Sequence, residues 1–301
     1  MALYAFDGTG NEDNADDAKD TNVVKFSEAY KDGYQGSGKN FYVEGVGTRK
    51  GFIGKVFGSI FGAGGEQRIE EAMEAAQKNF DRGDEIVDII GFSRGAALAL
   101  EFANQLREQG INNKVPEINF IGLWDTVASF GIPGNHINLG MTLTIPKNVN
   151  HCSHAMALDE RRDTFPLTRV IQDKYSDRNL AEIHEAWFRG FHSDVGGGNQ
   201  NQGLSSISLV WMFNRASDNG VLIPIDYMTK HQELRNPEAK SKKPGMDIIP
   251  DKKRTIFPED EVHESVNRRG LVVSGFESNN PPKGLKVTSD DGGIYDKGFE
   301  E

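Results

Sequence analysis

The stretch from Asp84 to Leu106 constrains the fold of this chain more than any other. An apolar β-branched run leads into Gly91-Phe92-Ser93-Arg94-Gly95, and helix-forming residues follow, so the pattern predicts a strand, a tight turn and a helix. In that context Gly-x-Ser-x-Gly is typical of a nucleophile elbow, whose glycines let the strand and helix backbones approach closely. The serine then lies at the tip of the turn, beside a helix N-terminus that favours negative charge.

Length and charge limit the classes of protein and partner. The 301 residues suffice for one large α/β domain, and we expect a single domain over residues 1–301. A formal net charge of −11 disfavours nucleic acid as a partner and leaves room only for local, transient membrane contact. One cysteine excludes an internal disulfide. No signal peptide or spanning helix is legible, which predicts cytoplasmic synthesis and export, if any, without a cleaved signal.

Three polar residues each follow a predicted buried strand. Asp7 follows Leu3–Phe6, Ser93 ends the strand of the elbow, and Asp125 follows Ile118–Trp124. The carboxyl ends of parallel strands line one crevice of an open sheet, so we expect these side chains at the same edge. The predicted fold class is α/β, α/β-hydrolase-like, with a mostly parallel sheet and helices on both faces.

A serine nucleophile requires a base and a group that orients the base. Of the seven histidines, His192 alone directly follows a convincing apolar strand, Glu185–Phe191, and precedes a glycine loop. We therefore predict His192 as the base and Asp125 as its orienting group. The order Ser93, Asp125, His192 is that of α/β-hydrolases.

Two further carboxylates compete for the orienting role. Asp194 lies two residues beyond the predicted base, where its side chain is better placed to bind N–H groups of its own loop. Asp7 precedes a glycine turn, which suits shaping an oxyanion pocket. The predicted backbone donors to the oxyanion are Arg94, which follows the nucleophile, together with Gly8 and Thr9. The expected reaction is acyl transfer to the serine and then to water, with no cofactor.

Residues 51–65 combine glycines with apolar side chains that recur every three to four positions. Two interpretations remain open, a mobile lid that contacts an acyl chain and ordinary packing over the sheet. The apolar residues of this stripe are Phe52, Ile53, Val56, Phe57, Ile60 and Phe61.

Two longer segments lack strong periodicity. Residues 132–184 are predicted to be a cap-like insertion that roofs the site, with a helix around Ala155–Arg162. Residues 227–301 are predicted to be loop-rich, with one short strand at Leu271–Val273. The basic runs Lys240–Lys243 and Lys252–Arg254 are interpreted as a solvated face.

Several of these motifs together resemble one known family. In order, and over roughly residues 4–216, they look like the signature blocks of the α/β-hydrolase domains that include the type VI secretion phospholipase effectors. The resemblance implies phospholipase A-type cleavage of glycerophospholipid esters, with Ser93, Asp125 and His192 at the triad positions. It also implies export by a type VI system, with a secretion-apparatus or immunity protein as partner. The blocks are Phe6–Asn11, Thr21–Val24, Gly45–Thr48, Gly91–Ala96, Leu123–Val127, Ala157–Arg162 and Trp187–Gly198.

Two hypotheses from other classes stay open at this point. Asp7, Asp125, His192 and Asp194 could hold Mg²⁺ or Zn²⁺ in a metal-assisted phosphohydrolase. Alternatively, the hydrolase shell could serve as a binding module without catalysis. Labelling by serine-reactive probes, inhibition by chelators and turnover of esters distinguish these two hypotheses from a serine hydrolase.

Overall fold

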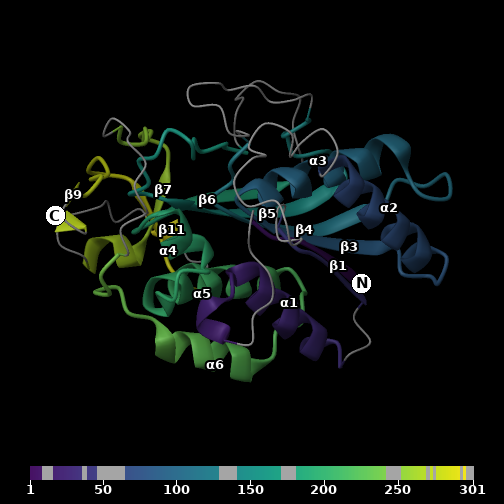
Figure 1. Cartoon of the computed structure of the whole chain (residues 1–301), viewed down its shortest axis with the longest axis horizontal. Helices are drawn as coiled ribbons and strands as arrows, with labels where there is room; N and C mark the ends of the chain where they lie inside the picture. Colours follow the sequence, from purple (N-terminus) through teal and green to yellow (C-terminus); the bar gives the residue numbers. More distant parts are fainter. Residues whose placement is uncertain are drawn as a thin grey trace, which may run out of the picture.

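A computed structural model describes residues 1–8, 16–35, 39–45, 65–128, 141–170, 181–241, 252–268, 272–273, 276–291 and 294–295. Within these ranges, a nine-stranded sheet runs through the molecule in the order β11-β10-β7-β6-β5-β4-β3-β1-β2 (Figure 1). Only β10 and β11 pair antiparallel in this sheet. The predicted α/β class with a mostly parallel sheet is confirmed.

The strands are short to medium in length, and most of their residues are buried. Those of the main sheet are β1 (Ala2–Phe6), β2 (Lys39–Val43), β3 (Ile86–Phe92), β4 (Glu117–Trp124), β5 (Val149–Ala157), β6 (Glu182–Phe188), β7 (Glu261–His263), β10 (Lys286–Thr288) and β11 (Ile294–Tyr295). A separate antiparallel pair consists of β8 (Val272–Val273) and β9 (Phe276–Glu277).

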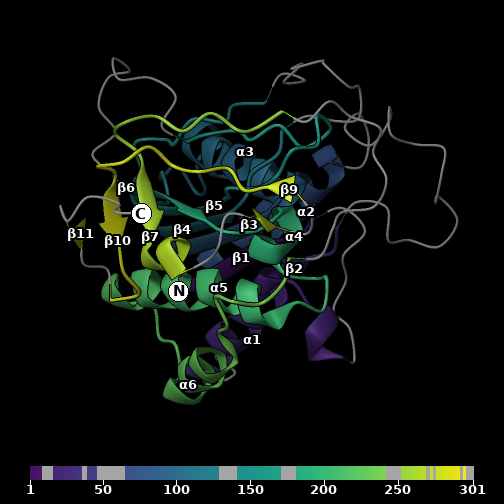
Figure 2. The same ribbon diagram turned by 90° about the vertical axis from the view of Figure 1, so that its left-hand side faces the viewer.

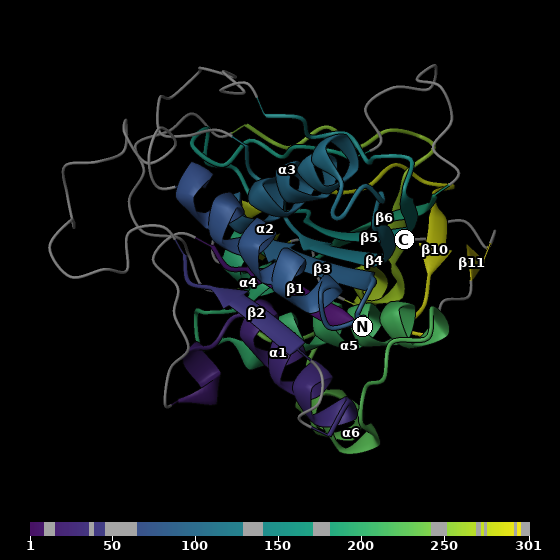
Figure 3. The same cartoon turned by 90° about the vertical axis from the view of Figure 1, so that its right-hand side faces the viewer.

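Helices cover both faces of the sheet, as predicted. Helices α2 and α3 lie on one face and α1 and α5 on the other, with α6 outside α5 (Figures 1 and 3). None of the described helices combines the length and apolar character needed to cross a bilayer. The helices are α1 (Asn22–Gly33), α2 (Glu66–Phe80), α3 (Arg94–Gln109), α4 (His192–Gly196), α5 (Gln202–Asp218) and α6 (Ile225–Leu234), with 3₁₀ turns at Asp17–Lys19 and Glu264–Arg268.

Burial on both faces explains why the central strands read as continuous apolar runs. Along β1, Tyr4 and Phe6 belong to the core beneath α2 and α3, whereas Leu3 and Ala5 belong to the core beneath α1 and α5. Successive side chains of a strand point to opposite faces, so each face of β1 has its own apolar partners. The sheet is thereby held between two layers of helices.

The strand order creates a topological switch point at the carboxyl edge of the sheet. Strand β1 pairs with β2 on one side and with β3 on the other, so the chain changes its direction of travel across the sheet between β1 and β3. Ligands of open α/β sheets bind at such switch points, outside the carboxyl ends of the strands. Asp7, Ser93 and Asp125 directly follow β1, β3 and β4, and therefore begin the loops at this edge.

One predicted helix is wrong. Val149–Ala157 forms β5, between β4 and β6, and the residues that follow it are not helical. Pairing on both sides overrides the weak local preference of its Ala and Met residues for a helix. The predicted insertion over residues 132–184 therefore contributes a central strand, while 132–140 and 171–180 of it lie outside the described residues. The division into a single domain with a cap stays a prediction.

The C-terminal part contains more regular structure than the sequence predicts. Strands β7 and β10 extend the main sheet beyond β6 (Figure 2), and α6 precedes them in the chain. Strands of three residues carry too little alternation for a pattern to predict them. Strand β8 agrees with the predicted strand at Leu271–Val273. The predicted strand Glu185–Phe191 is displaced, because β6 begins and ends three residues earlier.

The two glycines of the elbow pack as tightly as predicted. A Cβ on Gly91 would lie 2.6 Å from the Cα of Ala96, within the following helix. A Cβ on Gly95 would lie 2.2 Å from the carbonyl oxygen of Phe6 and 2.4 Å from that of Asp7. Gly95 thus lets the first turn of α3 rest directly on the end of β1.

We predict that Gly95→Ala destabilises the fold by about 3 kcal/mol or more, because backbone on both sides must move to admit the methyl group. Urea unfolding followed by tryptophan fluorescence measures the loss. Gly220→Ala is the matched control, since Gly220 has φ of +80° and nothing within 4 Å of an added Cβ. It should lose only about 1–2 kcal/mol to backbone strain. Equal losses in the two variants would contradict the close contact.

Candidate active site

Ser93 occupies the strained turn expected of an elbow. It precedes α3 with φ of 58° and ψ of −125°, a combination that few residues other than glycine adopt. Its N–H donates to the carbonyl of Trp124 at 3.0 Å, and its carbonyl accepts from the N–H of Val127 at 3.2 Å. These two bonds fix the elbow against the end of β4. The side chain is 5 % exposed.

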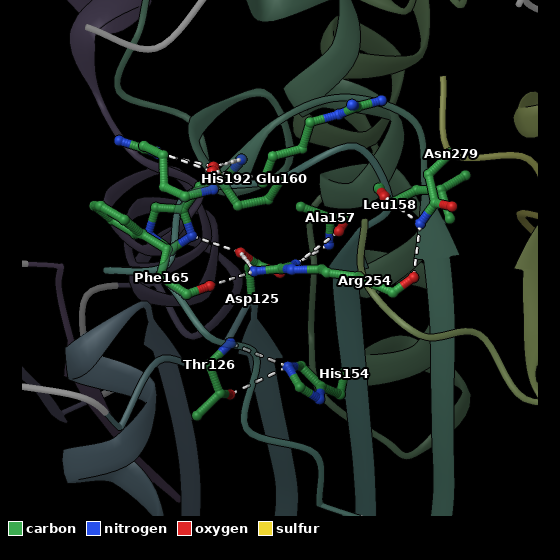
Figure 4. Close-up of polar contacts among 12 residues, drawn as sticks. Asp125, Thr126, His154, Ala157, Leu158, Glu160, Phe165, His192, Arg254 and Asn279 are labelled. Carbon is green, nitrogen blue, oxygen red and sulfur yellow. Dashed lines mark hydrogen bonds and ion pairs between the residues drawn. The ribbon is translucent and has the colours of Figure 1, made fainter. Parts of the chain in front are cut away.

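Asp125 and His192 are joined by a short hydrogen bond. The Nδ1 of His192, the first residue of α4, donates to Oδ2 of Asp125 at 2.6 Å (Figure 4). Both side chains are buried. The imidazole packs against the ring of Phe92, with 4.6 Å between centroids, and meets the edge of Phe165 at 4.8 Å. The predicted base therefore lies against the residue that precedes Ser93.

Two of the three predicted catalytic side chains, Asp125 and His192, thus make direct contact. Ser93 follows Phe92, whose ring contacts the imidazole, and its N–H donates to Trp124, which precedes Asp125. Among the described contacts, no hydrogen bond joins the Ser93 hydroxyl to the imidazole of His192. Catalytic hydrogen bonds often form only when substrate is bound.

Burial favours a neutral imidazole, and the neighbouring charges and hydrogen bonds favour an ionised carboxylate. Burial alone raises the pKa of Asp125, but the charge of Arg254 and the hydrogen bond from His192 outweigh it and hold that pKa far below its ordinary value. Burial lowers the pKa of His192, and Asp125 offsets this only in part. An imidazole that is neutral and donates Nδ1–H to Asp125 can accept a proton at Nε2.

Arg254 is a site residue that the sequence analysis misplaced. Instead of belonging to a solvated face, its side chain is 9 % exposed and forms an ion pair with Asp125, with 2.5 Å between Nη1 and Oδ1. A Lys-Lys-Arg run resembles any exposed basic segment, so no local pattern could have identified the contact. Lys252 and Lys253 are exposed, in agreement with the prediction.

Two carboxylates that follow β5 hold the loop that carries His192. Oε2 of Glu160 accepts the backbone N–H of His192 at 3.1 Å, and Oδ2 of Asp159 accepts the N–H of Gly190 at 2.8 Å. Burial raises the pKa of Glu160, but the hydrogen bond and charge of Arg162 lower it to about 2. The sequence analysis noted this Asp-Glu pair only as part of a motif and assigned it no role.

Asp194 makes the loop contacts expected of it. Its Oδ2 accepts the N–H of Phe191 at 3.0 Å, and its Oδ1 accepts the side-chain amides of Asn199 and Asn201 at 2.9 and 2.8 Å. Its carboxylate therefore shapes the turn around α4.

Asp7 is buried beside the elbow and already has three donors. Its carboxylate accepts from Thr21 Oγ1 at 2.8 Å, Tyr42 OH at 2.7 Å and the N–H of Gly8 at 2.7 Å. Burial raises the pKa of Asp7 to about 6, with these hydrogen bonds opposing the rise. Because the Gly8 N–H donates to this carboxylate, its role as an oxyanion donor stays a prediction.

Of the remaining predicted site residues, the structure describes Arg94 but not Thr9 or the apolar stripe. Arg94 opens α3 directly after Ser93, as expected of a backbone donor at a helix N-terminus. Thr9 lies outside the described residues, and so does the whole apolar stripe from Phe52 to Phe61.

The alternative hypothesis of a metal site finds little support in the geometry. No three of Asp7, Asp125, His192 and Asp194 bring their ligand atoms together, and the one group of three metal-ligand side chains among the described residues is His263, Glu264 and Asp290. Asp290 there already forms an ion pair with Arg235.

A pocket of about 430 Å³ opens beside the site. Its walls include the aromatic rings of Phe165, Trp187 and Phe257, and basic side chains such as Arg161 and Lys252. Phe165 links the pocket to the site, because its ring also contacts the imidazole.

We predict that Glu160→Gln lowers the free energy of unfolding at pH 7 by on the order of 3 kcal/mol, since the ionised carboxylate is held by Arg162 and two backbone N–H groups beside it. The pKa of Glu160 is depressed, so this stabilisation is present above about pH 4.5 and is lost as the pH falls toward 2. Urea unfolding of both proteins at a series of pH values should show the difference narrowing below pH 4.5. A difference that does not depend on pH would contradict the assignment.

Several solved structures are similar to part of this chain. An uncharacterised protein from Pseudomonas aeruginosa is 22 % identical, with a TM-score of 0.53 over 77 % of this chain and 48 % of that one. A Tle1 effector bound to the VgrG spike of the type VI secretion system is 23 % identical, with a TM-score of 0.41 over 65 % and 50 %. A thermostable esterase from Pseudomonas putida is 14 % identical, with a TM-score of 0.42 over 74 % of each chain.

The chain spans about half the length of the first two of these proteins. No curated protein matches it. The sequence model of the T6SS phospholipase effector Tle1-like catalytic domain matches residues 3–115 and 101–215, which is more than half of the 301 residues. The chain therefore belongs to the family of Tle1-like phospholipase effectors of the type VI secretion system and carries the region of their catalytic domain.

Proposed function

We propose that this protein hydrolyses acyl ester bonds of glycerophospholipids through an acyl-enzyme on Ser93. The observation that carries the proposal is the 2.6 Å hydrogen bond between buried Asp125 and His192, which packs against the strand that ends at the elbow. Membership of the phospholipase effector family supports the choice of substrate.

In the first half of the reaction, His192 takes the proton of Ser93 at Nε2 while the Ser93 oxygen attacks the ester carbonyl. Asp125 keeps Nδ1 protonated and stabilises the imidazolium. Negative charge develops on the former carbonyl oxygen, where the backbone N–H of Arg94 and the N-terminus of α3 stabilise it. The C–O bond to the leaving alcohol then breaks, and the imidazolium returns its proton to that alcohol.

In the second half, water replaces the alcohol. His192 accepts a proton from the water as its oxygen attacks the acyl carbon, and then returns the proton to the Ser93 oxygen when the acyl bond breaks. The products are a fatty acid and a lysophospholipid. The low pKa of buried His192 suits this role, because the imidazole is neutral at the start of each half-reaction.

The pocket beside His192 supports a lipid with an anionic head group over a simple apolar ester. Aromatic walls suit acyl or glycerol carbons, whereas Arg161 and Lys252 suit a phosphate. The net charge of −11 opposes general adhesion to an anionic membrane, so such a pocket would have to supply the attraction locally.

Delivery by a type VI secretion system is part of the proposal. Family membership supports it, and one similar structure is of a Tle1 effector bound to a VgrG spike. The partner of this chain would then be a component of the secretion apparatus.

We predict that a fluorophosphonate probe labels the protein and that Ser93→Ala abolishes the labelling, because the probe reacts only with an activated serine. Ser217→Ala, an exposed serine on α5, is the matched control and should be labelled like the wild type. Incubation with a bacterial lipid extract, followed by mass spectrometry, should yield fatty acid and lysophospholipid with the wild type alone. Labelling that survives in Ser93→Ala would overturn the proposal.

The same experiments separate the other hypotheses. Turnover that a chelator stops, in a protein that the probe does not label, would favour metal-assisted phosphohydrolysis. A folded protein with neither labelling nor turnover would favour a binding module.

The pH dependence should follow the protonation of His192. We predict that kcat/KM for a soluble neutral ester falls as the pH is lowered, along a limb whose midpoint lies below 6.5, because burial lowers the pKa of His192 from that ordinary value. A pH–rate profile measures it, and a midpoint above 6.5 would contradict the prediction.

Asp7 requires a control because its pKa of about 6 falls in the same range. The acid limb should persist in Asp7→Asn. Its disappearance there would identify Asp7, and not His192, as the titrating group.

A further inference from the structure

Arg254 reaches the centre of the site from a segment beyond the family match, which ends at residue 215. Its guanidinium binds the carboxylate of Asp125 in a bidentate manner, Nη1 to Oδ1 at 2.5 Å and Nη2 to Oδ2 at 3.1 Å (Figure 4). The same nitrogens donate to the carbonyls of Ala157 at 2.6 Å and Phe165 at 3.0 Å. Arg254 therefore joins the carboxylate to the end of β5 and to the loop that contains Phe165.

These bonds fix the orientation of the carboxylate. Oδ2 of Asp125 accepts from both His192 and Arg254, and Oδ1 accepts from Arg254 and from the N–H of Ala157 at 2.8 Å. With two donors on each oxygen, the carboxylate cannot rotate about its Cβ–Cγ bond without breaking several hydrogen bonds. A planar guanidinium provides this bidentate geometry, and an ammonium group does not.

Arg254 is itself held in place from a distant part of the chain. The side-chain amide of Asn279 donates to the carbonyls of Arg254 at 3.0 Å and Leu158 at 3.1 Å. The N–H of Asn279 donates to Asp159 at 3.0 Å, and Asp159 also accepts from Gly190, two residues before His192. The C-terminal segments are thus connected both to the orienting carboxylate and to the loop of the base.

The guanidinium also affects the charge of the imidazole. The carboxylates of Asp125 and Glu160 favour protonation of His192, whereas the cation Arg162 disfavours it. Because Arg254 and His192 share Oδ2 of Asp125, removal of the guanidinium would leave more of the carboxylate charge to stabilise the imidazolium.

We propose that Arg254 is a positioning residue for ester hydrolysis: it holds the Asp125 carboxylate in the plane that receives Nδ1–H of His192 and balances its charge. This proposal rests on the proposed function. It makes residues beyond the family match part of the working site. Arg254 acts through Asp125 and does not touch the reacting atoms.

The test compares Arg254→Gln, Arg254→Lys and the wild type on a soluble ester over a range of pH. In Arg254→Gln we expect kcat to fall roughly 10- to 100-fold with little change in KM, because the base is less well oriented. The acid limb should move to higher pH. Arg254→Lys keeps the positive charge but loses the bidentate hydrogen bonds of the guanidinium. Its acid limb should therefore stay near that of the wild type, while kcat remains reduced.

Arg215→Gln is the matched control for losing a buried arginine. Arg215 lies on α5, where it contacts Thr288 and stacks over Trp211, and it makes no contact with Asp125 or His192. It should lower stability and leave the acid limb unchanged. If the role of Arg254 were merely structural, Arg254→Gln would also lower stability and leave the acid limb unchanged. Wild-type kcat with an unchanged acid limb in Arg254→Gln would overturn the proposal.

Two further measurements keep the outcomes distinct. Should Arg254→Gln fail to fold, Arg254→Lys decides: reduced kcat supports the positioning role, and wild-type kcat overturns it. Probe labelling of Ser93 is measured in parallel. An unlabelled wild type refutes the proposed function itself. A labelled wild type, together with unchanged kcat and an unchanged acid limb in Arg254→Gln, refutes only the role of Arg254.

Discussion

The buried carboxylate of Asp125 is the group on which the rest of the site depends. An ionised carboxylate removed from water costs several kcal/mol unless donors replace the water. Here four hydrogen bonds do so, from the imidazole of His192, the N–H of Ala157 and both terminal nitrogens of Arg254. These donors come from three different segments, so satisfying one charge fixes the end of β5, the start of α4 and a C-terminal segment relative to the end of β4.

A second set of carboxylates extends this arrangement into the loops. Asp159, Glu160 and Asp194 all accept backbone N–H groups from the turn between β6 and α4, which carries the imidazole. Parallel strands bring their ends to one edge, but they do not determine the course of the loops beyond it. The three carboxylates fix the course of the loop between β6 and α4. This gives a physical reason for the Asp-Glu-Arg-Arg and His-Ser-Asp motifs of the sequence.

Local patterns predicted the elements that local physics determines. The glycines of the elbow act within a few residues, and the apolar runs before Asp7 and Asp125 predict their own strands; the structure agrees with each. The helix predicted around Ala155–Arg162 is wrong because residues 155–157 end β5, whose identity depends on the strands beside it. Arg254 could not be predicted at all, since its partner lies 129 residues away and its neighbours in sequence are ordinary exposed lysines.

The order of these segments along the chain has a consequence for synthesis. The elbow, Asp125 and His192 all leave the ribosome before Arg254, which supplies the last contacts at the carboxylate, and before Asn279, which binds the backbone carbonyl of Arg254. A nascent chain that ends before residue 254 can form the central strands, but it leaves a buried negative charge without its balancing cation and the outer side of β6 without β7. The complete site can therefore form only after this later segment has left the ribosome.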